Sequence, residues 1–319
     1  MVSINKLATK VAKEIIENAD RLGCQAYKMQ CGVNVIDMGV NVKGSWEAGL
    51  LYTRATIGDL GNVKLGEFKL NEEYTFSAVD LYIDEPLIAC LASQIAGWKL
   101  GMGEVATIGT GPARAQAQVE GDWYLAQTPY RDHNDEVVLC IQDIKLPAES
   151  IGELVAMECK VAPENVYILV APSNCIVGSM QVAARMCEQV CHKMFEKGFP
   201  VAKVVACRGK APIAPIVKDE VKAMGRINDA ILYGGETEFW VDATDVEIAK
   251  VIHQLVSKTS SPYYKELFEK VFVDAGKDFF YVDHDFHSIA KITMHNINTG
   301  KAYSAGEIAY NVLEESFLN

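Results

Sequence analysis

Two charged side chains three residues apart, Arg185 and Glu188, are the first candidates for chemistry in this sequence. They lie within residues 176–195, where apolar residues recur at helical spacing, so the two would be neighbours on one face of a helix. A carboxylate placed in this way can accept a proton from water and return it to a leaving group, while the arginine orients it. The alternative is an exposed ion pair worth about 0.2–0.5 kcal/mol. The spacing alone favours that alternative.

A glycine-rich segment at residues 109–115 is the second candidate. Gly109 and Gly111 would let backbone N–H groups approach a ligand, and Arg114 could pair with a phosphate or a carboxylate. The segment lacks the Lys-Ser/Thr of a Walker loop and the third glycine of a dinucleotide fingerprint. The pattern by itself therefore favours an ordinary turn before a helix.

The densest basic region of the chain includes Arg208 and Lys210 and could hold an anionic ligand tail. A solvated basic face explains these residues equally well. Further along, a predicted strand at residues 230–233 runs into Gly234 and Gly235, which would permit a close approach of the backbone to a ligand.

A possible metal site is suggested by residues 283–287, where His284 and His287 stand beside carboxylates. Imidazole and carboxylate groups suit zinc or iron. However, side chains three apart in a strand point to opposite faces, and the sequence has no HExxH motif. Packing histidines are the favoured interpretation, and a metal-dependent hydrolase is kept as an alternative function.

The composition limits the class of protein. The 319 residues are 50% hydrophobic and 23% charged, so the chain can bury enough apolar surface to fold. Its 42 acidic residues outnumber 30 lysines and arginines, for a net charge of −12. A nucleic-acid-binding protein needs a basic face, so we expect no nucleic-acid partner.

Cysteine usage and hydropathy predict a cytoplasmic location. The nine cysteines are odd in number, include no CxxC and lie mostly in apolar runs, as free thiols do in a reducing compartment. No run of about 18 apolar residues occurs, so we expect no membrane partner. Residues 3–22 show an amphipathic helical pattern with acidic residues, unlike a signal or transit peptide.

The predicted helices and strands are interspersed, which indicates an α/β (mixed α+β) fold. Strands are expected at residues 119–126 and 279–282, besides the one at 230–233, and a single helix at 177–197. No linker marks a domain boundary. We place it between residues 165 and 166, which gives an N-terminal part, 1–165, and a C-terminal part, 166–319, and we allow for domains that are discontinuous in sequence.

Four segments, taken together, carry a resemblance. They read GTGPARA at 109–115, APSN through GS to QVAAR and Glu188 at 171–188, APIAP at 211–215, and AMGRIND to YGG at 223–235. With the length and the opening VSIN, they resemble the methenyltetrahydromethanopterin cyclohydrolase family over essentially the whole chain.

The resemblance implies an enzyme of archaeal-type one-carbon metabolism and methanogenesis. It would hydrolyse 5,10-methenyltetrahydromethanopterin reversibly to the N5-formyl compound, with no metal, nucleotide or permanently bound cofactor. Tetrahydromethanopterin, or a variant of it, would be the one-carbon carrier. The resemblance also implies a cytoplasmic homotrimer of two-domain subunits, with the pterin in a cleft between the domains.

The resemblance also assigns residues. The family's essential Arg and Glu fall on Arg185 and Glu188, which reverses the preference for a surface ion pair. As substrate-binding candidates we take Gly109, Gly111, Arg114, Asn174, Ser179, Gln181, Lys210, Gly234 and Gly235. Arg208, Lys210 and Arg114 are the candidates for the acidic tail of the pterin. The stretch from His284 to Ser288 departs from the family pattern and receives no role. A non-catalytic, pterin-binding oligomer is the other alternative.

Overall fold

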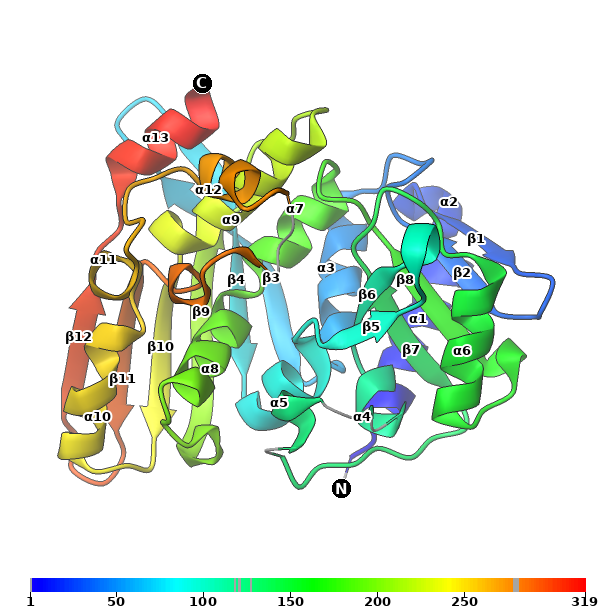
Figure 1. Cartoon of the computed structure of the whole chain (residues 1–319), viewed down its shortest axis with the longest axis horizontal. Helices are drawn as coiled ribbons and strands as arrows, with labels where there is room; N and C mark the ends of the chain where they lie inside the picture. The colour runs from blue at the N-terminus through cyan, green and yellow to red at the C-terminus, as the bar shows by residue number, and fades with distance from the viewer. Residues whose placement is uncertain (1, 118, 120–121, 127, 278–280) are drawn as a thin grey trace. The chain divides into compact units, whose positions relative to one another are not determined.

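The chain folds into two compact units, each built around a mixed sheet (Figure 1). The computed structural model describes residues 2–117, 119, 122–126, 128–277 and 281–319. The expected α/β class is confirmed. Within the described residues, no helix combines the length and the hydropathy needed to cross a bilayer.

Both units are discontinuous in sequence. The first contains Met1–Asn62 and Leu87–Gln181, and the second contains Val63–Pro86 and Val182–Asn319. This differs from the boundary expected after residue 165. The reason is strand pairing over a long sequence distance, because β4 (Thr75–Ile83) pairs with β9 (Val204–Pro212) in the second sheet.

The first unit has a six-stranded sheet in the order β1-β2-β8-β7-β6-β5. Its strands are β1 Gln25–Lys28, β2 Asn34–Asp37, β5 Trp98–Leu100, β6 Thr107–Thr110, β7 Val137–Ile141 and β8 Val166–Val170. The three central strands β2, β8 and β7 run parallel. β7 and β8 are apolar and buried along their whole length, as expected for strands covered on both faces.

Helices cover both faces of this sheet. α1 and α3 pack on the side that carries Val138 and Leu169, while α6 packs on the side that carries Leu139 and Ile168 (Figure 1). The helical elements of this unit are α1 Ile4–Glu17, α2 Ala19–Leu22, α3 Trp46–Thr56, η1 Leu87–Gln94, η2 Gly103–Val105, α4 Ala113–Ala117, α5 Trp123–Ala126, α6 Glu149–Cys159 and η3 Pro163–Asn165. α7, Ile176–Ala183, leads from the first unit into the second.

The second unit has a six-stranded sheet in the order β12-β11-β10-β9-β4-β3. Besides β4 and β9, its strands are β3 Gly61–Lys69, β10 Glu236–Val241, β11 Lys291–Asn296 and β12 Ala302–Gly306. β10 and β11 pair in parallel, and both alternate between buried and half-buried residues. One face of the sheet therefore faces the core of this unit.

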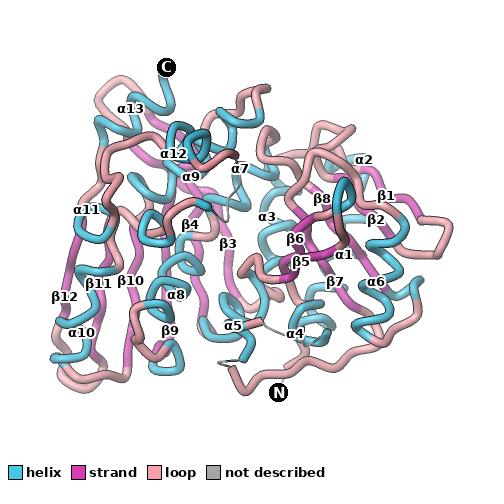
Figure 2. Tube along the Cα trace, in the orientation of Figure 1, coloured by secondary structure: helices cyan, strands magenta, loops and turns pink. Residues whose placement is uncertain are grey.

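Helices pack on the buried face of the second sheet. The helical elements of this unit are α8 Met186–Glu196, η4 Val201–Lys203, α9 Glu220–Gly234, α10 Asp245–Val251, η5 Ile252–Gln254, α11 Ser257–Ser260, α12 Phe268–Asp274, η7 His284–Phe286 and α13 Tyr310–Leu318. Figure 2 shows how loops separate these short helices along the trace.

Two of the expected strands are wrong. Residues 230–233 belong to α9, which begins after Asp219, whose side chain accepts the Lys222 N–H. Trp123–Ala126, inside the expected strand at 119–126, form helix α5, and an Asp122 carboxylate oxygen accepts the Leu125 N–H. Residues 230–233 thus lie near the end of a helix that begins ten residues earlier, whereas a polar cap begins α5 directly. The strand expected at 279–282 falls partly on residues 278–280, which lie outside the described part.

Candidate functional site

Arg185 and Glu188 lie at a break in the helix that was expected to be continuous. α7 ends at Ala183, and α8 begins at Met186 with Arg185 as its N-cap, at φ −84° and ψ 1°. Glu188 is consequently in the first turn of α8. The partial positive charge at a helix N-terminus stabilises a carboxylate there. The break therefore gives Glu188 an electrostatic setting that a continuous helix would not provide.

The two side chains form a buried ion pair. Arg185 Nη1 lies 3.3 Å from Glu188 Oε2, and the side chains are 12% and 7% exposed. Little water screens charges at such a depth, so their attraction is stronger than on a surface. The two side chains are therefore not a solvated surface pair, which was the alternative interpretation of their spacing.

The polar face of α8 continues past Glu188. His192 Nε2 lies 3.2 Å from Glu196 Oε1 one turn further on, and both side chains are mostly buried. The opposite side of the helix carries Met186 and Val190, which are fully buried. α8 therefore has one face in the core and one face of ionisable groups.

Close packing against β9 holds α8 in place. An added Cβ on Gly209 would overlap Met186 Cγ and lie 3.0 Å from Cys187 Sγ. Glycine at this position lets the first turn of the helix approach the strand. The sequence analysis did not select Gly209, although it lies between the two basic residues that were selected.

The glycines of residues 109–115 have structural explanations. Gly109 is buried in β6, where a Cβ would lie 2.8 Å from Leu139 Cδ1. Gly111 has φ +100°, a conformation that favours glycine, and its N–H donates to the Ser93 carbonyl at 2.9 Å. Both are internal, so this geometry gives no support to a direct contact with a substrate.

Arg114 is fully buried and pairs with Asp122. Its guanidinium also donates to the carbonyls of Ser93 and Ile95, at 3.2 and 2.9 Å. A charge at this depth requires such partners. These contacts give Arg114 a role in holding η1 and α4 together, and we do not carry it forward as a ligand for the pterin tail.

Polar side chains gather where the parallel strands β7 and β8 end. Gln142 follows β7, and its Nε2 donates to Ser173 Oγ, three residues after β8, at 2.8 Å. The Nε2 of the fully buried Gln181 donates to Gln142 Oε1 at 2.6 Å. Asn174 is half-buried beside Ser173, and Ser179 is buried on α7. The carboxyl ends of parallel strands are the usual place for ligands in open α/β sheets.

Gln142 was missed by the sequence analysis. Its position directly after the apolar run of β7, Val137–Ile141, is the signal, because a polar residue at that point lies at the carboxyl edge of the sheet. Gln181, selected through the family resemblance, contacts it directly.

Lys210 and Arg208 lie among carboxylates. On β9, Lys210 is directly opposite Asp80 of β4 and Glu236 of β10. Arg208 lies 3.6 Å from Glu238 and over the ring of Tyr82. The neighbouring negative charges weaken the attraction of both bases for an anion.

Gly234 and Gly235 are packing positions. Gly234 is the last residue of α9, which corrects the expected close-approach loop after a strand, and a Cβ there would lie 2.7 Å from Pro212 Cγ. A Cβ on Gly235 would overlap the side chain of Ile289. Both glycines are buried, so they allow α9 and its C-cap to approach neighbouring segments.

Of the two histidines considered for a metal, only His287 has a side chain within the described part of the structure. His287 is 7% exposed, and its ring packs 6.3 Å from the ring of Phe268. The His284 side chain lies outside the description. Within the described residues, no group of three His, Cys, Asp or Glu side chains has a metal-binding arrangement.

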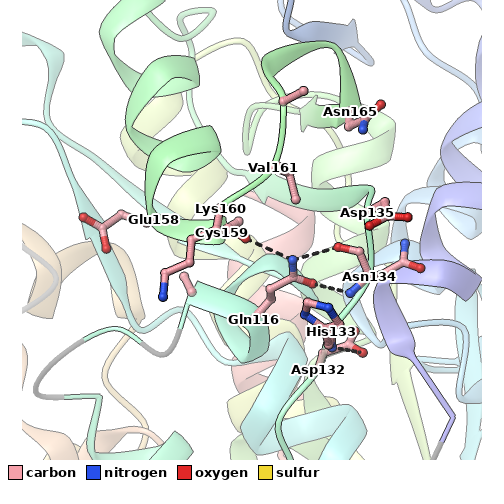
Figure 3. Close-up of a pocket in the computed structure, with 12 residues that line it drawn as sticks. Gln116, Asp132, His133, Asn134, Asp135, Glu158, Cys159, Lys160, Val161 and Asn165 are labelled. Atoms are coloured by element: carbon pink, nitrogen blue, oxygen red, sulfur yellow. Dashed lines mark hydrogen bonds between the residues drawn. The ribbon is translucent and has the colours of Figure 1, made fainter.

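A surface pocket of about 590 Å³ in the first unit contains none of the predicted site residues (Figure 3). Gln116 lies at its centre, where it donates to the carbonyls of Asn134 and Cys159 at 2.8 and 3.0 Å and accepts the Asn134 N–H. These bonds tie the lining segments to one another. We assign the pocket no catalytic role.

Comparison with known proteins identifies relatives along the full chain. A family model described as Cyclohydrolase (MCH) matches residues 3–317. A methenyltetrahydromethanopterin cyclohydrolase from Methanothermobacter marburgensis is 38% identical over 319 residues, covering 99% of both chains. Enzymes of the same name from Methanocaldococcus jannaschii and Methanosarcina barkeri are 37% and 36% identical, each covering 99% of this chain and 98% of their own.

Proposed function

The chain belongs to the cyclohydrolase (MCH) family, and we propose that it hydrolyses 5,10-methenyltetrahydromethanopterin reversibly to N5-formyltetrahydromethanopterin. We assign catalysis to Arg185 and Glu188 because their side chains form a buried ion pair at the start of α8. Full-length identity of 36–38% to enzymes named for this substrate supports the choice of substrate.

A single carboxylate can carry out the proton transfer that hydrolysis of this substrate requires. The methenyl bridge is an amidinium cation, which is already electrophilic, so water can attack its carbon without a Lewis acid. Glu188 accepts a proton from the attacking water and delivers it to N10 as the C–N10 bond breaks. The adduct hydroxyl then loses its proton to become the formyl oxygen on N5, and this second proton leaves to solvent. Arg185 holds the carboxylate in its orientation throughout.

Substrate binding is proposed at the polar groups that end β7 and β8. Gln181, Gln142 and Asn174 offer amide donors and acceptors that suit the edge of a pterin ring, with Ser179 buried nearby on α7. Tetrahydromethanopterin or a variant is the carrier, and we propose no permanently bound cofactor. We propose that Lys210 and Arg208 bind the acidic tail of the carrier. The carboxylates beside them reduce their attraction for an anion.

We also propose that the protein is a cytoplasmic homotrimer. The trimer is supported by the family resemblance. The cytoplasmic location is supported by the nine cysteines, eight of which are buried, as thiols often are in proteins of a reducing compartment.

The decisive experiment follows the methenyl chromophore after addition of purified protein. We expect its absorbance to decay and N5-formyltetrahydromethanopterin to form, as identified by mass spectrometry. A shifted but stable absorbance would indicate the non-catalytic pterin-binding protein. A decay that is abolished by EDTA and restored by zinc or iron would indicate the metal-dependent hydrolase and direct attention to His284 and His287.

A further inference from the structure

Helix α8 contains a buried ammonium group five residues after Glu188. The side chain of Lys193 is 0% exposed, and its Nζ lies 2.8 Å from Asp285 Oδ1. Lys197, one turn later, places its Nζ 2.5 Å from the same oxygen. A buried ammonium is costly unless a carboxylate compensates it. Asp285 therefore supplies the counter-charge that allows Lys193 to remain inside.

The Asp285 side chain is 42% exposed, and its backbone is held by neighbouring groups. It lies in η7, and its N–H donates to Asp283 Oδ1 at 2.8 Å. The next residue, Phe286, is fully buried and stacks on Phe268 of α12, with ring centroids 5.7 Å apart. A carboxylate anchored in this way can restrain the helix to which it is bonded.

The charges around Lys193 act in opposite directions. Burial lowers the pKa of Lys193, and the Asp285 carboxylate and Glu196 counter this effect, while Lys197 adds to it. The two lysines lower the pKa of Asp285, which keeps it ionised. Without Asp285, the ammonium would gain free energy by moving towards water, and α8 would have to shift to let it do so.

We propose that Asp285 is a positioning residue for catalysis, which neutralises the buried Lys193 and thereby fixes the seating of α8 and the location of Glu188. The proposal rests on the proposed function. Asp285 acts through the helix and touches neither Glu188 nor the substrate. Catalytic geometry is sensitive to small displacements, and a misplacement of about 1 Å can cost on the order of 10²-fold in rate.

The kinetic test compares Asp285→Asn, Lys193→Met and the double variant. Asp285→Asn should lower kcat by roughly 10–100-fold with little change in KM, because the groups proposed to bind the pterin are on other elements. The double variant should recover most of the lost rate, because Met fills the buried site and leaves no charge to compensate. As a matched control, Lys301→Met breaks the exposed pair with Asp245 and should leave kcat unchanged. A normal kcat in Asp285→Asn, or a loss that Lys193→Met does not rescue, would overturn the proposal.

Hydrogen exchange tests the restraint without reference to activity. Backbone amides of α8 should exchange faster in Asp285→Asn than in the wild type, and at the wild-type rate in the double variant. Unchanged exchange in α8 would overturn the proposal whatever the protein catalyses. Faster exchange, rescued in the double variant, in a protein that does not convert the methenyl substrate would support the restraint and refute the proposed function instead.

Discussion

At the scale of single residues, the proposed reaction depends on the Glu188 carboxylate. It is buried beside Arg185 in the first turn of α8, where it can exchange a proton with water and with N10. Glutamine has the same shape but cannot accept that proton. We therefore expect Glu188→Gln to lower kcat by roughly 10²–10⁴-fold, which corresponds to about 3–5 kcal/mol of barrier, while substrate binding is largely retained.

The measurement is turnover of the methenyl substrate by wild type and variant, after circular dichroism has shown that both are folded. Glu72→Gln is the matched control, because it makes the same substitution in an exposed pair with Lys69 and leaves α8 unchanged. Its turnover should stay near the wild-type rate. A Glu188→Gln rate above about a tenth of the wild type would exclude this residue as the base, because even weak acid–base effects exceed tenfold.

At the scale of elements, Asp229 connects three helices of the second unit. Located on α9, it accepts the Phe268 N–H of α12 at 2.9 Å and the Ser316 hydroxyl of α13 at 2.7 Å. Burial raises the pKa of this carboxyl to about 7, whereas the pKa of an aspartate in an unfolded chain is about 3.9. Between these two values, the folded state holds more protons than the unfolded state. This carboxyl therefore makes the free energy of unfolding fall as the pH rises from about 4 to about 7.

Asp229→Asn should remove that component of the pH dependence. Denaturant midpoints measured between about pH 4 and about pH 7 should decline less steeply with rising pH in the variant than in the wild type. Asp245→Asn is the control, because the pKa of Asp245 is lowered to about 2, chiefly by Lys301, so its contribution is lost as the pH falls and has the opposite sign to that of Asp229. Identical slopes for Asp229→Asn and the wild type would show that the carboxyl is already ionised at low pH.

At the scale of the whole molecule, we expect association into a trimer. Sedimentation at micromolar concentration should give a mass near three times 35.0 kDa. Burial of exposed apolar side chains such as Met102, which is 87% exposed, and Trp123, which is 74% exposed, would favour association. A monomeric mass at that concentration would contradict the assignment of a trimer, without bearing on the chemistry of Glu188.

Local pattern in the sequence determined the class of fold and the adjacency of Arg185 and Glu188, whereas their proposed catalytic role came from the family resemblance. The apolar runs at β7 and β8 predict strands covered on both faces, because such runs avoid water on either side. The spacing of Arg185 and Glu188 predicts neighbours on a helix, and their side chains do form an ion pair. Periodicity in a sequence reports interactions between residues a few positions apart. The apolar strands and the adjacency of Arg185 and Glu188 depend mainly on such local interactions.

Only the tertiary structure decided which charges are buried and with what partners. Asp285 meets Lys193 across 92 positions of sequence, and β4 meets β9 over a still longer distance. The break at Arg185 and the burial of Arg114 are equally invisible to local spacing. The free energy of a charge depends on its desolvation and on the groups that the fold brings to it, and neither is encoded within one helical turn.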